Sequence, residues 1–207
     1  MHQIIIAIII SYLVGSIPTA YIFGKVLKGI DIRKSGSGNV GATNAFRVLG
    51  RSAGITVLIL DTLKGLFCVV VAGNFAVLEN VAVHGLLVRI ILGLVCICGH
   101  NWTIFLQFKG GKGVATTLGV LIGLGIIIPG LGLALSLAVL TWAVVFAVSR
   151  VVSVASIISS IIFPVFVFLF KQPTSILILS LLLCGFILLR HKGNFQRILQ
   201  GKERRLF

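Results

Sequence analysis

Seven apolar runs constrain the fold of this chain more than any other feature of its sequence. A helix needs about 20 apolar residues to cross the hydrocarbon core of a bilayer, where its backbone polar groups must bond to one another. Runs of about that length lie near residues 4–26, 52–73, 80–99, 114–129, 131–148, 152–170 and 174–190. The fourth and fifth are short and meet at Pro129 and Gly130, so five or six spans are an alternative. We predict an all-α, polytopic integral membrane helical bundle of about seven transmembrane helices.

The composition agrees with a membrane protein that forms one domain. Of the 207 residues, 58% are hydrophobic and 11% are charged, far outside the range of soluble globular domains. No linker or low-complexity tract separates the runs, so we expect a single transmembrane domain over residues 1–207. The first run is longer than the apolar core of a signal peptide, so we expect it to remain in the mature protein. Several glycines are expected to let helices approach closely: Gly119, Gly123, Gly125, Gly130 and Gly132.

The basic residues predict the orientation of the helices. With an odd number of spans, nearly all of them fall on one side, and only Lys171 lies in a loop on the other. Because basic loops stay in the cytoplasm, we expect the amino terminus outside and the carboxyl terminus inside. A net charge of +14 would suggest nucleic acid in a soluble protein, but no basic-aromatic module is present, so we expect anionic lipid and phosphorylated metabolites instead. The basic side holds Lys25, Lys28, Arg33, Lys34, Arg47, Arg51, Lys109, Lys112, Arg150, Arg190, Lys192, Arg197, Lys202, Arg204 and Arg205.

Several classes of catalytic site are disfavoured. All four cysteines lie in apolar runs without the spacing of metal ligands, so we interpret them as small core residues. With only four acidic residues, mechanisms that need paired carboxylates or a cluster of metal ligands are disfavoured. The chain also lacks the nucleophile elbow Gly-x-Ser-x-Gly and the zinc motif His-Glu-x-x-His. We therefore expect no metal and no cofactor.

The segment between the first two runs has the composition of an anion-binding loop. Glycines permit positive φ, so backbone N–H groups can converge on an anion, and hydroxyl and amide groups add donors. An arginine adds a fork suited to two phosphate oxygens. A solvated loop has a similar composition, but the basic flank here favours a function. The candidate ligands are Ser35, Gly36, Ser37, Gly38, Asn39, Thr43, Asn44 and Arg47.

A second segment of this kind, GHNWTIFLQFKGGKGVAT over residues 99–116, precedes the fourth run. Its glycines and lysines stand where we expect a helix to begin, and the amino end of a helix attracts anions. It is not a P-loop, since Lys112 is followed by Gly113 rather than by serine or threonine. A positive-inside anchor is the alternative, but glycine anchors a helix end poorly. The candidates are Lys109, Gly110, Gly111, Lys112 and Gly113.

Two histidines and three intramembrane charges complete the candidates. His100 opens the second segment and His191 opens a third basic stretch, RHKGNFQRILQGKE. A lone boundary histidine is more often structural, but two of them beside anion loops make a function equally plausible. Asp61 and Arg89 lie at matching depth in neighbouring runs, with Lys64 one turn from Asp61. A functional site and a buried ion pair that fixes helix register explain these charges equally well.

Together these segments resemble the bacterial membrane glycerol-3-phosphate acyltransferases that use acyl phosphate as acyl donor. SGSGNVGATN with Arg47, GHNWTIFLQFKGGKGVAT and RHKGNFQRILQGKE are similar to the family's three motifs, and the resemblance covers essentially the whole chain. Asp61 and Lys64 fit its D-x-x-K-G pattern. Ser153 and Ser156 fit its short serine loop between the fifth and sixth spans. Gly193 departs from the pattern, because the family usually has an acidic residue there, and Arg89 lies outside the pattern.

The resemblance implies transfer of a fatty acyl group from acyl phosphate to the 1-hydroxyl of glycerol 3-phosphate, giving lysophosphatidic acid and inorganic phosphate in phospholipid biosynthesis. It implies a multi-pass protein of the bacterial cytoplasmic membrane. The expected partners are glycerol 3-phosphate, acyl phosphate, membrane lipid and the soluble enzyme that supplies acyl phosphate. The implied catalytic residues are Ser35, Ser37, Arg47, His191 and Asn194. Beyond the loop residues above, the implied substrate-binding residues are His100, Ser153, Ser156, Lys192 and Arg197, and the structural ones are Asp61, Lys64 and Glu203.

The chemistry of the loops supports this reaction, with a transporter for an organic phosphate as the alternative. An acyl phosphate is already activated, so a protein need mainly bind two phosphates, align a hydroxyl and stabilise the oxyanion. Transporters usually bind substrate near the midplane, on broken helices of repeated halves, whereas the donors here cluster at one face. The sequence leaves two candidate bases, His191 and a phosphate oxygen of a substrate.

Overall fold

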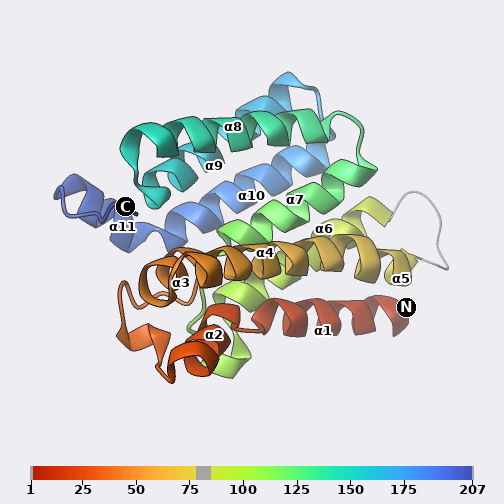
Figure 1. Ribbon diagram of the computed structural model, residues 1–207. Coiled ribbons are helices and arrows are strands. Elements are labelled where there is room, and N and C mark those ends of the chain that lie inside the picture. The colour runs from red at the N-terminus through yellow and green to blue at the C-terminus, as the bar shows by residue number, and fades with distance from the viewer. Residues whose placement is uncertain (1, 78–84, 207) are drawn as a thin grey trace. The chain divides into compact units, whose positions relative to one another are not determined.

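The computed structural model describes residues 2–77 and 85–206, which contain helices and no strands (Figure 1). A π-helix, η2 (Cys68–Ala72), joins α4 to α5, and two short 3-10 helices, η1 (Ile32–Lys34) and η3 (Ile104–Leu106), lie in the two glycine-containing loops. The helices form two compact units, one that ends at Leu124 and one that begins at Gly125. The α-helices are α1 (His2–Ser16), α2 (Thr19–Lys28), α3 (Ala42–Leu49), α4 (Arg51–Phe67), α5 (Gly73–Val77), α6 (Gly85–Asn101), α7 (Val114–Ile127), α8 (Leu131–Ser149), α9 (Val152–Leu169), α10 (Thr174–Arg190) and α11 (Lys192–Leu199).

The helix lengths support the predicted all-helical membrane fold, with four to six candidate spans in the described residues. Arg51–Val77, Gly85–Leu106, Leu131–Ser149 and Val152–Leu169 are each long and apolar enough to cross a membrane. Two bent pairs, α1 with α2 at 41° and α10 with α11 at 61°, raise the number to six if each pair is one span. The fourth predicted run forms α7, which is shorter at 14 residues. Part of the predicted run 80–99 lies outside the described residues.

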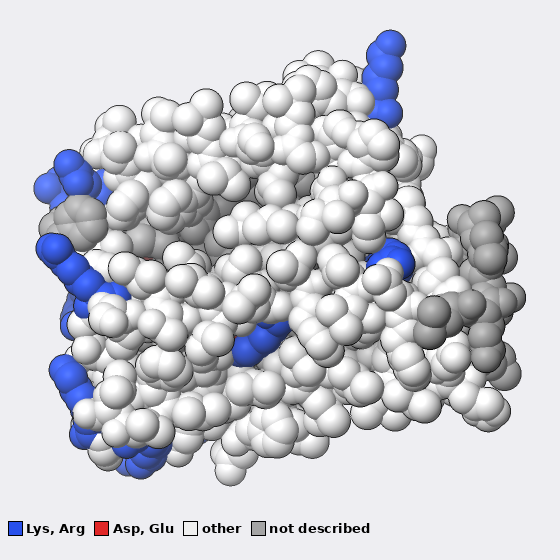
Figure 2. Space-filling model, turned by 45° about the vertical axis from the view of Figure 1, so that its right-hand side comes forward, with Lys and Arg blue, Asp and Glu red and all other residues white. Residues whose placement is uncertain are grey.

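The surface has the character expected for contact with lipid. Figure 2 shows Lys and Arg side chains as separate blue patches among the white, uncharged residues of this face. Many large apolar side chains are exposed, for example Val148 of α8 at 83% and Ile126 of α7 at 68%. A soluble protein would not expose apolar area on this scale. The exposed faces of these helices are therefore suited to a bilayer.

The unit that begins at Gly125 is built around α8, α9 and α10. Gly130 has a φ of 81° at the amino end of α8, which confirms a break between the fourth and fifth predicted runs. α8 packs along α9, and α9 packs along α10. The hydroxyl of Ser159 donates to the carbonyl of Ala138 at 2.7 Å, and Trp142 stacks on Phe146 with ring centroids 5.0 Å apart. Polar and aromatic contacts thus join α8 to α9 and stiffen α8.

In the unit that ends at Leu124, α1 packs along α6 through glycines. A Cβ at Gly15 of α1 would overlap the backbone of Cys96, and a Cβ at Gly99 of α6 would overlap the carbonyl of Tyr12. Small residues at such positions let two backbones approach closely, which favours helix association in lipid. The carboxyl ends of α1 and α6 are therefore held side by side, and the second loop described below starts at the end of α6.

Glycines also bring α4 and α7 together. A Cβ at Gly65 would overlap the carbonyl of Thr116 and lie 2.7 Å from the nitrogen of Val120. A Cβ at Gly119 would overlap the carbonyl of Thr62. The predicted packing role is confirmed for Gly119. It is wrong for Gly132, where a Cβ would meet no described atom within 4 Å.

The ion pair considered for Asp61 and Arg89 is not formed. Arg89 instead binds the π-helix and α5: its Nη1 donates to the carbonyl of Val69 in η2 at 2.6 Å, and its Nη2 donates to Oδ1 of Asn74 in α5 at 2.6 Å. Asp61 pairs with Lys64 of its own helix, at 2.6 Å. Matching depth in two helices did not predict a pair, because each charge found a partner nearer along the chain or in the irregular backbone of η2.

Replacing Gly65 by alanine is expected to destabilise the protein by about 1 to 3 kcal/mol, the usual cost of overpacking. The added methyl group would meet backbone atoms of α7, which cannot rotate away. Thermal unfolding in detergent, followed by circular dichroism, measures the change. Gly185→Ala is the matched control, since a Cβ there meets no described atom within 4 Å and alanine favours a helix. Equal melting temperatures for the two variants would contradict the proposed close packing.

Candidate functional site

Asn44 organises the first loop, which joins α2 to α3. Its side chain, at the start of α3, is only 1% exposed. Its Oδ1 accepts from the backbone N–H of Ser37 at 2.8 Å. Its Nδ2 donates to the carbonyls of Ile32 at 3.2 Å, Ser35 at 3.1 Å and Asn39 at 2.9 Å. Because both ends of the amide bind loop backbone, Asn44 shapes the loop in this structure, and the sequence analysis did not foresee that use.

Two glycines give the loop its curvature. Gly36 has a φ of 64° and Gly38 a φ of 73°, which confirms the predicted positive φ for these two residues. A Cβ at Gly36 would overlap Oδ1 of Asn44. The N–H of Gly38 donates to the carbonyl of Ser35 at 3.0 Å. Two of the loop's backbone donors, those of Ser37 and Gly38, therefore serve the loop itself, so a phosphate would depend more on side chains such as Ser35, Thr43 and Arg47.

An ion pair stiffens the start of the same loop. Arg33 and Asp31 form a two-pronged contact, with Nη2 to Oδ2 at 2.7 Å and Nε to Oδ1 at 3.0 Å. The guanidinium also lies over the ring of Tyr21, 5.2 Å from its centroid. The hydrogen bond from Arg33 is the main reason that the pKa of Asp31 falls to about 2. The Arg33 side chain is therefore engaged within the loop itself, and Arg47 lies in the last turn of α3.

The second loop, which joins α6 to α7, folds back onto the end of α6. The N–H of Gly110 donates to the carbonyl of Asn101 at 3.1 Å, and the N–H of Gly111 donates to the carbonyl of His100 at 3.0 Å. α7 begins at Val114, directly after Gly113 with its φ of 78°. The first N–H groups of a helix have no partner within it. The donors at the start of α7, rather than those of Gly110 and Gly111, are therefore the backbone groups suited to an anion.

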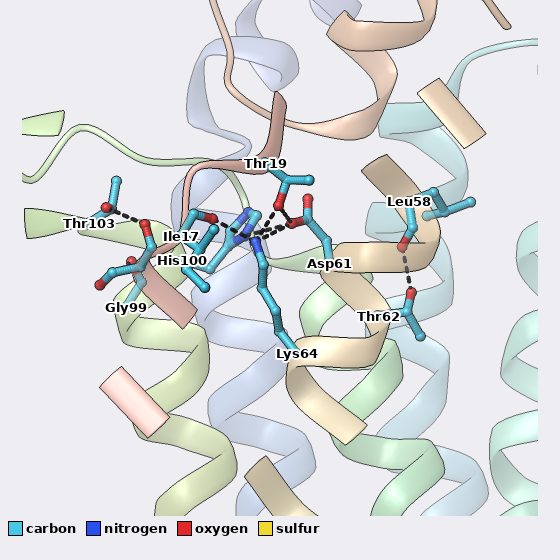
Figure 3. A network of polar contacts seen from close by, with 10 residues as sticks. Ile17, Thr19, Leu58, Asp61, Thr62, Lys64, Gly99, His100 and Thr103 are labelled. Atoms are coloured by element: carbon cyan, nitrogen blue, oxygen red, sulfur yellow. Dashed lines mark hydrogen bonds and ion pairs between the residues drawn. The ribbon is translucent and has the colours of Figure 1, made fainter. Parts of the chain in front are cut away.

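His100 lies behind this returning segment, in the last turn of α6. Its side chain is 8% exposed. Gly111 lies so close to the ring that a Cβ there would overlap Nε2. On its other side, Nδ1 lies 3.9 Å from Oδ1 of Asp61, as Figure 3 shows. The ring therefore lies between the second loop and the charged residues of α4.

Those charged residues form a buried cluster with Thr19 (Figure 3). The hydroxyl of Thr19 donates to Oδ1 of Asp61 at 2.8 Å, and Nζ of Lys64 donates to the same oxygen at 2.6 Å. Lys64 also donates to the hydroxyl of Thr19 and, at 2.6 Å, to the carbonyl of Ile17. The side chains of Asp61 and Lys64 are 2% and 8% exposed. Sequence reasoning missed Thr19, for which the available signal was a threonine directly after the helix-breaking Pro18.

In the second unit, Glu203 accepts hydrogen bonds from three side chains, two of the third motif and one of α9. Its carboxylate accepts from the hydroxyl of Ser153 at 2.8 Å, from Nδ2 of Asn194 at 2.5 Å and from Nε of Arg197 at 2.7 Å. Burial raises the pKa of Glu203, but these three hydrogen bonds outweigh burial and hold the pKa below its ordinary value. The carboxylate is therefore charged at neutral pH and joins the chain after α11 to the first turn of α9.

His191, at the junction of α10 and α11, is held in one orientation. Its ring is buried, 3% exposed, and Nδ1 lies 2.8 Å from the carbonyl of Ile187. A carbonyl can only accept, so we assign the proton of the neutral ring to Nδ1. The lone pair is then at Nε2, which can accept a proton. This tautomer suits a general base.

Ser156 lies in a helix rather than in the expected loop. α9 begins at Val152, so both serines of the expected loop are in its first turns. The hydroxyl of Ser156 donates to the carbonyl of Val152 at 2.9 Å and accepts from Nε1 of Trp142 at 3.2 Å. Ser156 therefore joins α8 to α9 in this structure, while Ser153 binds Glu203.

The candidate residues thus fall into two sets, one in each unit. The first unit contributes a loop shaped by Asn44 and a loop fixed on the end of α6, with Lys109 exposed and Lys112 half-buried. The second contributes His191, Asn194 and Arg197, with Lys192 exposed at the start of α11. Within the described residues, no group of three or more His, Cys, Asp or Glu side chains could hold a metal ion.

Asn44→Asp is expected to loosen the first loop, because an oxygen would replace the Nδ2 that faces three carbonyls. Losing hydrogen bonds worth about 1 kcal/mol each and leaving their acceptors without a donor should speed amide exchange at residues 32–39 by about tenfold or more. Hydrogen–deuterium exchange with mass spectrometry measures this. Asn39→Asp, at a half-buried neighbouring position, is the control. Unchanged exchange in Asn44→Asp would show that the loop does not depend on this amide.

Glu203→Gln is expected to free the segment after α11 at neutral pH, since the neutral amide binds Arg197 more weakly. Because the folded-state pKa of Glu203 is depressed, its contribution is complete above the ordinary glutamate pKa and is lost as pH falls through the lower folded-state value. The difference between wild type and variant should therefore persist in mild acid and disappear only below the ordinary pKa. Anisotropy of a dye attached at Lys202→Cys reports the mobility. A difference that disappeared near neutral pH would contradict this assignment.

The chain is similar to known proteins over almost its whole length. The family model for glycerol-3-phosphate acyltransferase matches residues 5–201. The chain is 41% identical over 202 residues to glycerol-3-phosphate acyltransferase 2 of Moorella thermoacetica, covering 98% of this chain and 97% of that one. It is 42% identical over 193 residues to a glycerol-3-phosphate acyltransferase of Gloeobacter violaceus, covering 93% and 90%.

Solved structures agree with the sequence relatives. The chain resembles the crystal structure of PlsY (YgiH), an integral membrane glycerol 3-phosphate acyltransferase, in its glycerol 3-phosphate form. The TM-score is 0.84 at 37% identity, over 98% of this chain and 94% of that one. The lysophosphatidic acid form of the same enzyme gives a TM-score of 0.81 at 36% identity, with the same coverage. The resemblance seen in the three motifs is confirmed, and the chain belongs to the glycerol-3-phosphate acyltransferase family.

Proposed function

We propose that this integral membrane acyltransferase transfers a fatty acyl group from acyl phosphate to the 1-hydroxyl of glycerol 3-phosphate. The products are lysophosphatidic acid and inorganic phosphate. The observation that carries the proposal is the similarity, at TM-scores of 0.84 and 0.81, to structures described as glycerol 3-phosphate and lysophosphatidic acid forms. These two ligands correspond to the acceptor and the product of the proposed reaction. Acyl phosphate as donor is supported by the motif resemblance and by the chemistry of the loops.

In the proposed reaction, the 1-hydroxyl oxygen of glycerol 3-phosphate attacks the acyl carbonyl carbon. The bond between that carbon and the bridging phosphate oxygen then breaks, and phosphate leaves with the bonding electrons. The hydroxyl proton passes to Nε2 of His191 or to a phosphate oxygen of a substrate. His191 is supported as base by its hydrogen bond to the carbonyl of Ile187, which leaves the lone pair at Nε2.

The remaining candidate residues receive binding roles in this proposal. Ser35, Ser37, Thr43 and Arg47 bind one phosphate from the first loop, and Lys109 and Lys112 bind phosphate beside the start of α7. Within the second unit, Asn194 and Arg197 are the proposed donors to substrate. Gly110, Gly111 and Gly113 contribute by allowing close approach of backbone, since two of their N–H groups already bind α6. Asp61, Lys64 and Glu203 keep structural roles.

We further propose seven spans in one domain over residues 1–207. Four long helices count as one span each, and so does each of the bent pairs, α1 with α2 and α10 with α11. The shorter helix α7 brings the number to seven. The placement of basic residues supports an amino terminus outside and a carboxyl terminus inside, and the bacterial relatives support a bacterial cytoplasmic membrane. The proposed partners are membrane lipid and a soluble enzyme that supplies acyl phosphate. A phosphate transporter would explain the basic loops but not the membership in an acyltransferase family.

Lys112→Ala and Arg47→Ala are each expected to lower catalytic efficiency at least about tenfold. Losing a charge-assisted hydrogen bond to a bound phosphate costs about 1.5 to 3 kcal/mol, and about 1.4 kcal/mol corresponds to tenfold. The melting temperature should stay near that of wild type. Steady-state kinetics with both substrates measures the effect. Lys34→Ala, an exposed basic residue of the first loop, is the control. A loss of folded protein without a kinetic defect would assign these residues to the fold.

Product and labelling assays test the proposed donor and the direct mechanism, which has no acyl-enzyme, together. Purified protein given acyl phosphate and glycerol 3-phosphate should form lysophosphatidic acid and phosphate in equal amounts. Given labelled acyl phosphate alone, it should release no burst of phosphate and retain no label after denaturation. Stoichiometric label on Ser35, Ser37 or a cysteine would show that the mechanism is wrong, and no product with both substrates would show that the donor is wrong.

A further inference from the structure

The first span is interrupted at Ile17 and Pro18, and side chains from two other segments bind the carbonyls there. Proline has no N–H and cannot continue the helical ladder, and the last carbonyls of a helix lack helical partners. Nζ of Lys64 donates to the carbonyl of Ile17 at 2.6 Å, and the hydroxyl of Thr103 donates to the carbonyl of Ser16 at 2.5 Å. Polar backbone in an apolar span needs partners from the protein itself. Thus α4 and the second loop both hold the same break.

The ammonium group of Lys64 binds the residues on both sides of this break and Asp61 of its own helix. An ammonium has three donors, and the structure gives Lys64 three acceptors: the carbonyl of Ile17, the hydroxyl of Thr19 and Oδ1 of Asp61. Thr19 in turn donates to Asp61 at 2.8 Å. The charge pair is therefore more than a neutralised pair within α4, since its geometry fixes where α1 ends and α2 begins.

The same cluster reaches the second loop through His100 (Figure 3). The ring nitrogen Nδ1 of His100 lies 3.9 Å from Oδ1 of Asp61, and Gly111 lies against the opposite edge of the ring, at Nε2. The backbone carbonyl of His100 also accepts the N–H of Gly111 at 3.0 Å. A displaced His100 ring would therefore clash with the segment that carries Lys112, or lose contact with it.

We propose that Asp61 and Lys64 are positioning residues for the second loop. The pair holds the α1 break and the His100 ring in one arrangement, and the ring sets the position of residues 110–112. The consequence for substrate phosphate rests on the function proposed above, whereas the coupling of the pair to the loop does not. The simpler alternative is a pair that only keeps α4 in register with α1, which predicts an unchanged loop once the fold is retained.

The variant Asp61→Asn/Lys64→Met separates these alternatives, because it removes both charges and leaves no buried charge without a partner. We expect the variant to fold in detergent with a modest fall in melting temperature, because the carbonyl of Ile17 loses Lys64 but keeps the N–H of Thr19 at 3.0 Å as a donor. Amide exchange in residues 106–114 should become at least about tenfold faster, while residues 32–39 of the first loop exchange as before. In steady-state assays, KM for the phosphate-bearing acceptor should rise about tenfold, with a smaller change in kcat.

Three further variants keep the test decisive. Thr62→Val changes a threonine of the same helix whose hydroxyl donates only within α4, to the carbonyl of Leu58 at 2.9 Å, so loop exchange should stay at the wild-type rate. Thr19→Val removes one hydroxyl of the cluster and no charge, and it should speed loop exchange to a smaller extent. Thr19→Ser restores the hydroxyl and should restore slow exchange. If the charge-free variant does not fold, Thr19→Val and its rescue by serine decide the question.

The outcomes for coupling and for catalysis are separate. Wild-type exchange of residues 106–114 in folded Asp61→Asn/Lys64→Met, or in Thr19→Val, would overturn the proposal even if the enzyme acylates glycerol 3-phosphate. Faster exchange that extends equally to residues 32–39 would also overturn it, since that is general loosening. Selective loosening of the second loop in a protein that makes no lysophosphatidic acid would support the coupling and reject the proposed function.

Discussion

Backbone carbonyls that leave a helix within apolar surroundings need donors from the protein, and the structure depends on how this constraint is met. Water is absent from a bilayer core, so an unsatisfied carbonyl there costs several kcal/mol. At the α1 break, Lys64 binds the carbonyl of Ile17 and Thr103 binds that of Ser16. At the π-helix, Arg89 binds the carbonyl of Val69. Lys64 and Arg89, two charged side chains within apolar runs, are thus used where the helices are irregular.

The cost of burying these charges suggests why they remain. A buried ion pair adds little to stability compared with well-packed apolar side chains, because desolvation offsets the attraction. What it adds is a defined geometry: Asp61 and Lys64 accept only an arrangement in which Thr19, Ile17 and His100 stand at set distances. The proposed reaction, on an already activated acyl donor, needs hydrogen-bond donors fixed in place more than it needs a strong nucleophile. For that function, rigidity near the two loops is a chemical advantage that can outweigh the cost of burial.

Sequence reasoning predicted the helices well because the signals are local. Each of these signals acts through the backbone of its own segment. The structure has helices at the apolar runs, and it has positive φ at Gly130, Gly36 and Gly38. The partners of side chains were harder to predict, because they depend on packing between segments distant in sequence. Asp61 was considered with Arg89 on depth alone, and Thr19 was not considered, since nothing in a list of apolar residues shows which helix end needs a donor. No sequence signal indicated that Glu203 would accept hydrogen bonds from three side chains.

The two loops share a construction that changes how phosphate binding should be understood. In each, one buried polar side chain holds the backbone: Asn44 in the first loop and His100 behind the second. The N–H of Ser37 donates to Oδ1 of Asn44, and the N–H groups of Gly38, Gly110 and Gly111 donate to backbone carbonyls of the same segments. A nest of free backbone donors, as the glycines alone suggested, is therefore not the main resource of these loops. Their glycines serve shape and close approach, and in the proposed function phosphate recognition depends on cationic side chains and on the first turn of α7. Such a site separates the residues that set geometry from those that carry charge, so that removing a lysine can abolish binding while the loop keeps its fold.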